Sequence, residues 1–393
     1  MSRTSAARKT LPLFTHAQAA ELKPELREVI EYRKSGLSLN HVVGCPLDCG
    51  YCVRHLFDNF AMKTPRALMS DEDAVTALTT HRYFQPGRTP LQLFNRATDP
   101  MLPGVKPHTL HVLSLLDAKG LTNHVLVITR WRVTPDDCAA LNSFRHIKLT
   151  VLVTHSGITD ERIEPVDSSI AAASLRTLHA HADNYRTILY WRPLVPGLND
   201  TDAHLERARE LSRCAHATVF TGLFYRRQIA DYYTAHGLPT PYEDTARRKI
   251  LPAQAEQRVL AAFHQPRDAA APYGALFRKT SCAVAYAHGE ADYNGHYGIR
   301  ELCDICPATQ TDRCATAHRH PDMTEVNRQA RQLGATAPAE LTERAIIVEG
   351  LDEPPRYYLQ HTHGYQVHDR AKPHHPHRHG RADIGWPTEE EGP

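Results

Sequence analysis

Residues 45–52 read Cys45-Pro46-Leu47-Asp48-Cys49-Gly50-Tyr51-Cys52, which places three thiols on one short stretch with the spacing C-x3-C-x2-C. An apolar run over 37–43 precedes them and is typical of a strand. Iron–sulfur clusters are held by cysteine thiolates, usually four of them. Three thiolates on one loop therefore suit three corners of a cubic cluster and leave the fourth iron open to another ligand. The competing interpretation is a structural zinc site, which usually needs four ligands in paired C-x2-C knuckles.

Composition limits the class of protein. The chain has 393 residues, enough for one large domain and a smaller one. Its formal net charge is +2, so no overall field favours nucleic acid or a membrane surface. The sequence contains no apolar run of ~18 residues and no apolar core of a secretory signal, so we expect no membrane span and a cytoplasmic location. The nine cysteines are an odd number and lie mostly in two groups, which indicates metal ligands rather than a disulfide framework.

Strand-like and helix-like stretches alternate along the middle of the chain, which predicts a parallel sheet covered by helices. The strands are mostly apolar, as expected when both faces of a sheet are buried. Six such units are too few for a complete eight-unit barrel, so the predicted fold class is α/β with a partial (βα)6 barrel. The strand-like runs are 37–43, 91–94, 125–129, 147–154, 187–191 and 218–224, and the helix-like stretches lie near 71–80, 107–119, 135–143, 168–182 and 201–213.

Polar residues follow every predicted strand. Ligands bind at the carboxyl ends of the strands in parallel α/β folds, so these residues are the candidates for a binding site. After the cysteine loop they are Asn95-Arg96-Ala97-Thr98-Asp99, Thr129-Arg130, Thr154-His155-Ser156, Arg192 and Tyr225-Arg226-Arg227.

A second group of cysteines comprises Cys282, Cys303, Cys306 and Cys314, within a region, 273–318, that we expect to be rich in loops. Four protein ligands would make a closed site, suited to structure or electron transfer rather than to substrate binding. Thiolates suit both iron–sulfur clusters and zinc. We favour a second cluster and keep structural zinc as the alternative.

The expected organisation has four parts. Residues 1–36 form an N-terminal helical and mobile segment, with helical character over 17–34, and residues 37–265 form the barrel. Residues 266–367 form the cysteine-rich module, with a short helix over 323–334 and a hairpin of strands over 344–350 and 355–360. The remaining residues, 368–393, are rich in His and Pro and are expected to be disordered.

The stretch CPLDCGYC over 45–52 resembles the signature of the radical S-adenosylmethionine (SAM) superfamily. Ala97-Thr98-Asp99-Pro100, Ile128-Thr129-Arg130 and the run from Pro193 to Asp200 are similar to the spore photoproduct lyase-like branch, so that the resemblance covers about residues 37–230. The branch usually continues past Asp-Pro into an aromatic residue, Gln, Pro and Glu. Here Met101-Leu102-Pro103-Gly104-Val105 follows instead.

The resemblance implies a [4Fe–4S] cluster on Cys45, Cys49 and Cys52, with SAM on the open iron. It also implies reductive cleavage of SAM to a 5′-deoxyadenosyl radical that abstracts hydrogen from a substrate, with an electron from a flavodoxin- or ferredoxin-type reductant. The substrate is left open among small molecules, nucleotides and nucleic acids. By position, the residues expected to bind SAM are Tyr51, Asn95, Thr98, Asp99, Thr129, Arg130 and Ser156.

Two other interpretations remain. A non-catalytic, metal-bearing protein on a degenerate barrel would bind nucleic acid through basic and aromatic residues over 224–227 and 277–279. A net charge near zero does not favour extended contacts with phosphates. Alternatively, the region 273–318 is a lid stabilised by zinc.

Overall fold

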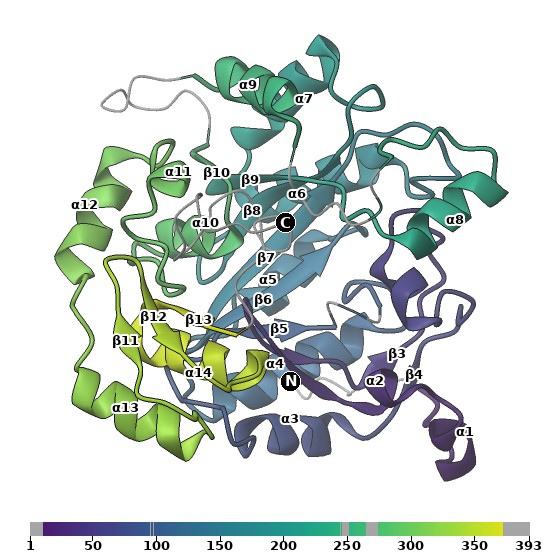
Figure 1. The fold of residues 1–393 in the computed structure, drawn as a ribbon. Coiled ribbons are helices and arrows are strands. Elements are labelled where there is room, and N and C mark those ends of the chain that lie inside the picture. Colours follow the sequence, from purple (N-terminus) through teal and green to yellow (C-terminus); the bar gives the residue numbers. More distant parts are fainter. Residues whose placement is uncertain are drawn as a thin grey trace, which may run out of the picture.

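The computed structural model describes residues 11–94, 96, 98–243, 245, 251–264 and 274–371. Its main sheet has eight strands in the order β1-β2-β5-β6-β7-β8-β9-β10. From β2 onward each strand is parallel to its neighbour, and β1 alone is antiparallel to β2. Figure 1 shows this sheet at the centre of the molecule with helices around it. The predicted α/β fold class is confirmed.

The predicted βα units account for most of this sheet. β10, Leu276–Phe277, adds one short parallel strand beyond β9. The strands predicted from the sequence are β2 (Gly36–Leu39), β5 (Leu91–Leu93), β6 (His124–Thr129), β7 (Lys148–His155), β8 (Arg186–Leu194) and β9 (Ala217–Gly222). The helices are α3 (Asp71–Thr79), α4 (Lys106–Ala118), α5 (Pro135–Leu141), α6 (Ser168–Ala180), α7 (Asp202–Ser212), α8 (Arg227–Ala235) and α9 (Ala253–Ala262).

Capping residues fix where several of these helices begin. The Ser70 side chain accepts a hydrogen bond from Asp73 N at the start of α3. Thr134 and Asp137 form a reciprocal capping box at the start of α5. Each cap satisfies backbone N–H groups that have no partner inside the helix. The βα connections that lead from the strand ends are therefore set by local sequence.

The two faces of the sheet have separate cores, because side chains alternate between faces along a strand. On β6, Val125 and Val127 belong to the outer core beneath the helices, whereas Leu126 faces inward. The inner core also contains Ala283 and Val284 of α10 (Thr280–Ala287), which contacts β8 and β9. A helix from the C-terminal part of the chain thus covers part of the concave face.

The edge strand β1, Ile30–Arg33, was predicted to be helical, and this prediction is wrong. Only the short helices α1 (His16–Ala20) and α2 (Pro24–Arg27) form over the predicted segment. Residues 30–33 alternate between buried and half-buried positions, the period of a strand, and they pair with β2. Tyr32 of β1 also hydrogen-bonds to Nδ1 of His361 at 2.8 Å, which ties this edge to the C-terminal part of the chain.

The C-terminal part of the chain has more regular structure than expected. The region predicted to be rich in loops contains α10, α11 (Arg300–Cys303) and α12 (Ala308–Ala317). The short helix expected near 323–334 corresponds to α13, Met323–Gln332.

The predicted hairpin is wrong, because residues 355–360 lie in α14, Glu353–His363, instead of a strand. Prolines occupy the first turn of α14, where their missing N–H groups lose no hydrogen bond. This helix connects two parallel strands, β12 (Ala345–Val348) and β13 (Gln366–Asp369), and β11 (Glu340–Leu341) pairs antiparallel with β12. The expected start of the tail at residue 368 falls within β13, and residues 372–393 lie outside the described part.

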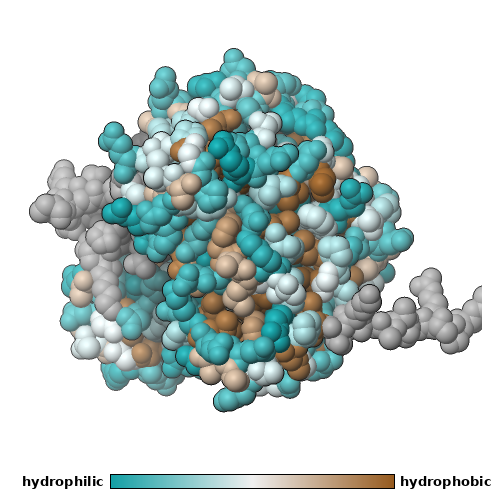
Figure 2. Space-filling model, turned by 90° about the vertical axis from the view of Figure 1, so that its right-hand side faces the viewer, coloured by the Kyte–Doolittle hydropathy of each residue, from teal (hydrophilic) through white to brown (hydrophobic). Residues whose placement is uncertain are grey.

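Two short strands lie beside the cysteine loop. β3 (Val42–Val43) and β4 (Arg66–Ala67) pair antiparallel, and the 3-10 helix η1 (Val53–Phe57) follows the last cysteine. On the face shown in Figure 2, hydrophobic residues appear as streaks within a mainly hydrophilic surface. Within the described ranges, no helix has both the length and the apolar character needed to cross a membrane.

Candidate metal and cofactor site

The cysteine loop is shaped by backbone contacts on both sides. Gly44 has φ +106°, and a Cβ atom there would lie 2.4 Å from the carbonyl oxygen of Thr64, so this position requires glycine. Cys45 N donates to the carbonyl of Met62 at 2.9 Å, and Gly50 N donates to that of Ile163 at 2.9 Å. The loop is therefore held at both ends before it enters η1.

A buried arginine lies beneath this loop. Arg54 on η1 is 2% exposed. Its guanidinium donates to the carbonyl oxygens of Cys45 at 2.9 Å, Phe60 at 3.2 Å and Met62 at 3.4 Å, and also to that of Leu47. These contacts fold the loop around the Arg54 guanidinium. Arg54 was not among the site residues predicted from the sequence.

The three thiols differ in how deeply they are buried. Cys45 and Cys49 are buried, and Cys52 is half-buried. Burial raises the pKa of the Cys45 thiol, against the lowering effect of Arg54. Burial likewise raises the pKa of the Cys49 thiol, against the effect of Arg130. Metal ligation requires thiolates and releases their protons, so these thiols would exchange protons for metal bonds.

A cavity of about 290 Å³ adjoins the three thiols at the carboxyl ends of the strands and continues along the inner face of the sheet. Asn95 lies outside the described residues, and Ser156 is not part of the cavity lining. Of the other polar residues predicted from the strand ends, those that follow β5 and β6 meet here together with Thr154 and Arg192. His155, Tyr225, Arg226 and Arg227 do not line this cavity. The lining includes Cys45, Cys49, Cys52, Tyr51, Thr98, Asp99, Thr129, Arg130, Arg192 and Phe224.

Asp99 uses its carboxylate to join neighbouring strand ends. Its Oδ1 accepts hydrogen bonds from Thr129 Oγ1 at 2.6 Å and from Met101 N at 2.9 Å. Its Oδ2 accepts from Arg130 N at 2.9 Å. Burial raises the pKa of Asp99, and these hydrogen bonds oppose that effect. The contacts make Asp99 a residue that positions Thr129 and Arg130.

Arg130 belongs to a buried network with a carboxylate that was not among the predicted site residues. Its Nη1 lies 3.2 Å from both carboxylate oxygens of Glu164 and also donates to the Tyr51 hydroxyl, which in turn donates to Glu164. Ser156 Oγ donates to the same carboxylate at 3.0 Å. Glu164 lies in an irregular segment after β7, where no sequence pattern marks it as a site residue. The only signal for it in the sequence is that a buried arginine such as Arg130 needs an anionic partner.

Two hydroxyl groups in this cavity lack a protein partner. Thr98 Oγ1 and Thr154 Oγ1 are buried without a hydrogen bond, and both residues line the cavity. Arg192, by contrast, has a partner: its guanidinium lies 4.2 Å from the centre of the Tyr190 ring, and its Nη1 donates to the Tyr190 hydroxyl at 3.4 Å. An unmade buried hydrogen bond costs about 1–3 kcal/mol. These groups fit a polar ligand beside the thiols, so the residues present suit a cluster with an amino-acid-like ligand.

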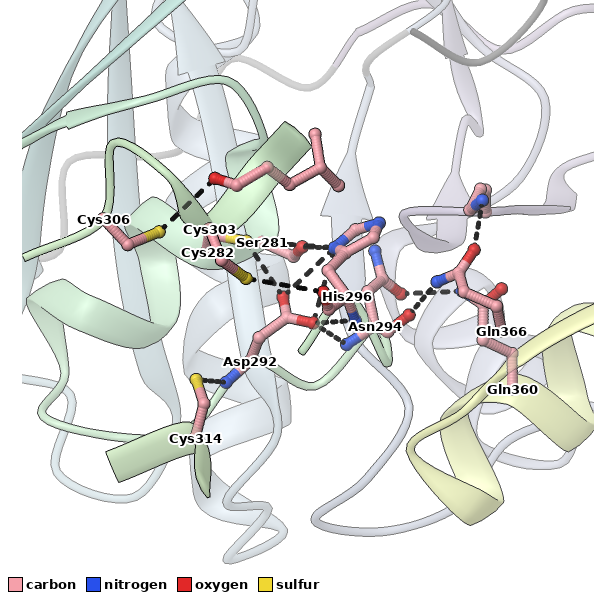
Figure 3. Close-up of polar contacts among 12 residues, drawn as sticks. Ser281, Cys282, Asp292, Asn294, His296, Cys303, Cys306, Cys314, Gln360 and Gln366 are labelled. Carbon is pink, nitrogen blue, oxygen red and sulfur yellow. Dashed lines mark hydrogen bonds and ion pairs between the residues drawn. The ribbon is translucent and has the colours of Figure 1, made fainter. Parts of the chain in front are cut away.

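The second cysteine group also comes together in space (Figure 3). The four thiols lie on or beside α10, α11 and α12 and line one cavity of only about 10 Å³. Asp292 and His296 line the same cavity, and neither was among the predicted ligands. Their side chains lie in the segment between α10 and α11 and point toward Cys282.

The two isolated cysteines lie apart from both groups. Cys138 on α5 is fully buried in the outer core, and Cys214 follows α7 and is half-buried. Neither lines the cavity beside the cysteine loop or the cavity of the second group.

The fold and the site together define an α/β protein with an incomplete parallel barrel and a three-cysteine loop at the carboxyl edge of its sheet. Neither a family model nor a curated protein matches the chain.

Solved structures do match, and they include the branch that the sequence resembles. One variant of spore photoproduct lyase shares 12% identity over 61% of this chain and 77% of its own, with a TM-score of 0.45. A second variant shares 13% identity over 65% and 84%, with a TM-score of 0.43. Streptococcus suis SuiB bound to the precursor peptide SuiA shares 10% identity over 52% and 47%, with a TM-score of 0.34. One further spore photoproduct lyase structure carries AdoMet and a dinucleoside spore photoproduct.

Proposed function

We propose that this chain is a radical SAM enzyme that binds a [4Fe–4S] cluster through Cys45, Cys49 and Cys52. The observation that carries the proposal is the position of these thiols. All three line a cavity of about 290 Å³, which leaves room on one side of the loop. A closed structural site would instead surround its metal with four protein ligands.

When bound, the cluster and SAM supply a one-electron cleavage of the sulfonium that yields a 5′-deoxyadenosyl radical and methionine. The protein contributes a fixed loop, because Arg54 gathers the carbonyl groups around Cys45. Asp99 fixes the adjoining ends of β5 and β6. Both residues also line the cavity, so they hold the loop and the strand ends in place directly beside the proposed ligands.

Two unpartnered hydroxyls and one guanidinium of the cavity are suited to bind SAM or substrate. Thr98 and Thr154 offer hydroxyls without protein partners, and Arg192 offers a cation over the ring of Tyr190. Arg130 and Tyr51 are already engaged with Glu164, so their expected contribution is a rigid wall rather than a free donor. An anionic group on the ligand, such as a carboxylate, would find its partner in Arg192.

Apolar side chains form much of the remaining wall. Leu126, Ile128 and Leu223 line the cavity on the inner side of the barrel. Such a lining excludes water from the reacting groups, which a reactive alkyl radical requires. The substrate class stays open among small molecules, nucleotides and nucleic acids, and the flavodoxin- or ferredoxin-type reductant and the cytoplasmic location stay predictions.

The test is anaerobic reconstitution followed by reduction in the presence of SAM. We expect about four irons at this site and formation of 5′-deoxyadenosine. The triple variant Cys45→Ala, Cys49→Ala, Cys52→Ala should lose both, and Cys214→Ala serves as the matched control. Undiminished cleavage of SAM by the triple variant would contradict the proposal. Tight, salt-dependent binding of nucleic acid without 5′-deoxyadenosine would favour the non-catalytic alternative.

We further propose that Cys282, Cys303, Cys306 and Cys314 hold a second metal centre. All four line one cavity. The sequence favoured an iron–sulfur cluster here and kept zinc as the alternative, and the metal content of the triple variant separates the two.

A further inference from the structure

Three side chains of the C-terminal module converge on one point (Figure 3). Cys282 lies on α10, whereas Asp292 and His296 lie in the segment between α10 and α11. The side chains of Asp292 and His296 are only 2% and 4% exposed. Among the described residues, these three form the one group of at least three His, Cys, Asp or Glu side chains whose ligand atoms all lie within 4.8 Å of one another.

The distances between the three ligand atoms match those around one tetrahedral ion. Cys282 Sγ lies 3.6 Å from Asp292 Oδ1 and 3.8 Å from His296 Nδ1, and His296 Nδ1 lies 3.4 Å from Asp292 Oδ1. Zn–S bonds of about 2.3 Å and Zn–N or Zn–O bonds of about 2.0–2.1 Å place sulfur about 3.6 Å from nitrogen or oxygen, and nitrogen about 3.3 Å from oxygen. Each separation agrees within about 0.2 Å, so one ion fits between the three side chains with little movement.

Hydrogen bonds alone do not account for this arrangement. His296 Nδ1 faces Cys282 Sγ and Asp292 Oδ1, and it also lies 3.2 Å from Ser281 Oγ. The ring nitrogen of a neutral histidine carries either one proton or one lone pair, so it makes a good hydrogen bond to only one of these partners. A metal ion replaces the competing contacts among the three ligand atoms with one bond to each of them.

The two carboxylate oxygens of Asp292 have different surroundings. Oδ2 accepts hydrogen bonds from Asn294 N at 3.0 Å and from His296 N at 2.9 Å, which fix the carboxylate against its own loop. Oδ1 is turned toward Cys282 and His296. A buried carboxylate needs compensating charge, which a divalent cation on Oδ1 supplies. Asp292 is therefore oriented as a ligand before the ion binds.

The ligand types and the available space select the metal. Thiolate, imidazole and carboxylate are all common ligands of zinc, whereas iron–sulfur clusters are usually held by four cysteine thiolates. The cavity that these side chains line measures about 10 Å³. A cavity of roughly 10–15 Å³ holds about one water molecule, and a cubane of four irons and four sulfides needs far more space. The site thus suits a single zinc ion.

The other three thiols of the module line the same cavity but have partners of their own. Cys303 Sγ and Cys306 Sγ donate to backbone carbonyl oxygens at 3.7 Å and 3.6 Å, and Cys314 Sγ accepts from Asp292 N at 3.4 Å. None of the three belongs to the group of mutually close ligand atoms. Asp292 and Cys314 also line an adjoining cavity of about 120 Å³, which offers the ion a route from solvent.

We infer that Cys282, Asp292 and His296 bind one zinc ion, with water in the fourth position of the tetrahedron. The inference rests on the proposed second metal centre, and it assigns Asp292 and His296 as ligands in place of three of the four thiols. Three protein ligands and one water are a common zinc arrangement. The site is independent of the proposed radical chemistry, and each can fail without the other.

The ion joins the two open edges of the main sheet (Figure 3). Cys282 lies on α10, which follows the edge strand β10. On the other side, Asn294 Oδ1 lies 2.6 Å from His361 Nε2 of α14 and accepts from Gln360 Nε2 at 3.1 Å. His361 Nδ1 in turn lies 2.8 Å from the Tyr32 hydroxyl on the opposite edge strand, β1. A metal bond from Cys282 to this loop completes a chain of contacts from β10 to β1.

The first test measures metal content in the whole chain. After anaerobic reconstitution with iron, sulfide and zinc, the native chain should hold about four irons and about one zinc. The triple variant Cys45→Ala, Cys49→Ala, Cys52→Ala should lose the iron and keep the zinc. About four irons in the triple variant would show a second cluster and overturn the inference. A triple variant without any metal would contradict the second metal centre as a whole.

Single variants then identify the ligands. Asp292→Asn and His296→Gln should each weaken zinc binding by more than about 100-fold in competition with a chromophoric chelator, beyond the 10- to 100-fold typical of residues that only orient ligands. Asp312→Asn, at an exposed position on α12, is the matched control and should leave the affinity unchanged. Cys303→Ser should change the affinity by less than about 10-fold. Unchanged affinity in Asp292→Asn together with loss of zinc in Cys303→Ser would overturn this ligand set and leave a thiolate centre in its place.

A spectroscopic measurement on the unaltered sequence covers the case in which a variant does not fold. Co²⁺ bound in place of zinc absorbs through charge transfer from each thiolate ligand, so the intensity of this band reports the number of thiolates. We expect the intensity of one thiolate, that of Cys282. The intensity of three or four thiolates would overturn the inference.

Discussion

Replacing Arg54 with methionine tests the idea that one buried cation shapes the cysteine loop. Methionine keeps much of the length of the side chain and removes its hydrogen-bond donors. In the native chain the guanidinium donates to four carbonyl oxygens, two of them, those of Cys45 and Leu47, within the loop. Arg54→Met therefore leaves these carbonyl groups without their partner while the side chain stays buried.

The magnitude follows from the number of contacts. Each hydrogen bond to a charged group contributes about 1.5–3 kcal/mol. The sum over all four hydrogen bonds exceeds the decrease in the free energy of unfolding that we expect. In the variant the loop can open, so that its carbonyl groups bind water, and in the native chain burial of the Arg54 charge is itself unfavourable. Loss of one member of a buried charged network typically costs about 3–5 kcal/mol. We therefore expect Arg54→Met to lower the free energy of unfolding by about 3 kcal/mol, a large part of the 5–15 kcal/mol typical of a native protein.

Two measurements check this expectation. Denaturant unfolding gives the change in stability, and iron analysis after reconstitution should show loss of the first cluster while any metal at the second cysteine group is kept. Arg54→Lys should restore part of both, because lysine keeps the charge but not the planar set of donors. Arg176→Met is the control, since Arg176 pairs with Glu210 on the surface at 2.8 Å, where such pairs contribute about 0–1 kcal/mol. A native iron content together with a stability change below about 0.5 kcal/mol in Arg54→Met would refute the reasoning.

Thr98→Val and Thr154→Val should each weaken the binding of SAM by roughly 2- to 10-fold in an equilibrium binding measurement. Neither change should lower the stability of the protein, because the buried hydroxyls have no protein partner. Unchanged affinity for SAM in both variants would contradict a ligand role for these hydroxyls. Glu164→Gln should cost about 3–5 kcal/mol in denaturant unfolding, because Arg130 loses its buried carboxylate; a loss below about 1 kcal/mol would mean that water or Asp99 compensates. For Asp71, burial raises the pKa, but hydrogen bonds from three histidines outweigh this effect, so the pKa is lowered. Because the pKa of Asp71 is lower in the folded state than in the unfolded chain, the ionised carboxylate stabilises the folded state at pH values above the usual carboxyl pKa near 3.9. This stabilisation is lost as the pH falls below that value. The stability difference between the native chain and Asp71→Asn should thus shrink as the pH falls from about 5 towards 2, and a difference independent of pH in this range would contradict the prediction.

The parts of the fold that were predictable are those set by local pattern. The apolar runs that form β6, β7 and β8 are long, bounded by helix caps and buried on both faces. Their apolar pattern alone was therefore sufficient to predict them as strands. The first three cysteines lie on one loop, so their proximity followed from spacing alone. The meeting of Thr98, Thr129 and Arg130 at one cavity followed from the rule that parallel strands end at the same edge.

The parts that were not predictable depend on partners distant in sequence. β1 resembles a helix until it pairs with β2, and residues 355–360 resemble a strand until the preceding prolines start a helix. Glu164 and Arg54 take their roles from contacts that no short pattern encodes. The type of metal at the second cysteine group also depends on the space between thiols, and sequence spacing gives their order but not that space.

The helix α10 explains how six predicted βα units can enclose a site without forming a complete barrel. The sheet order begins at β1 and ends at β10, and these two strands are not neighbours in it. α10 follows β10 directly and packs its alanine-rich face against the inner side of β8 and β9. Its first residue, Thr280, lines the large cavity, and Cys282, one half-turn later, lines the small one. One helix therefore serves both as the wall of the proposed SAM site and as a ligand-bearing element of the proposed second metal centre. A metal bound at Cys282 would hold the wall of the barrel where strands are missing.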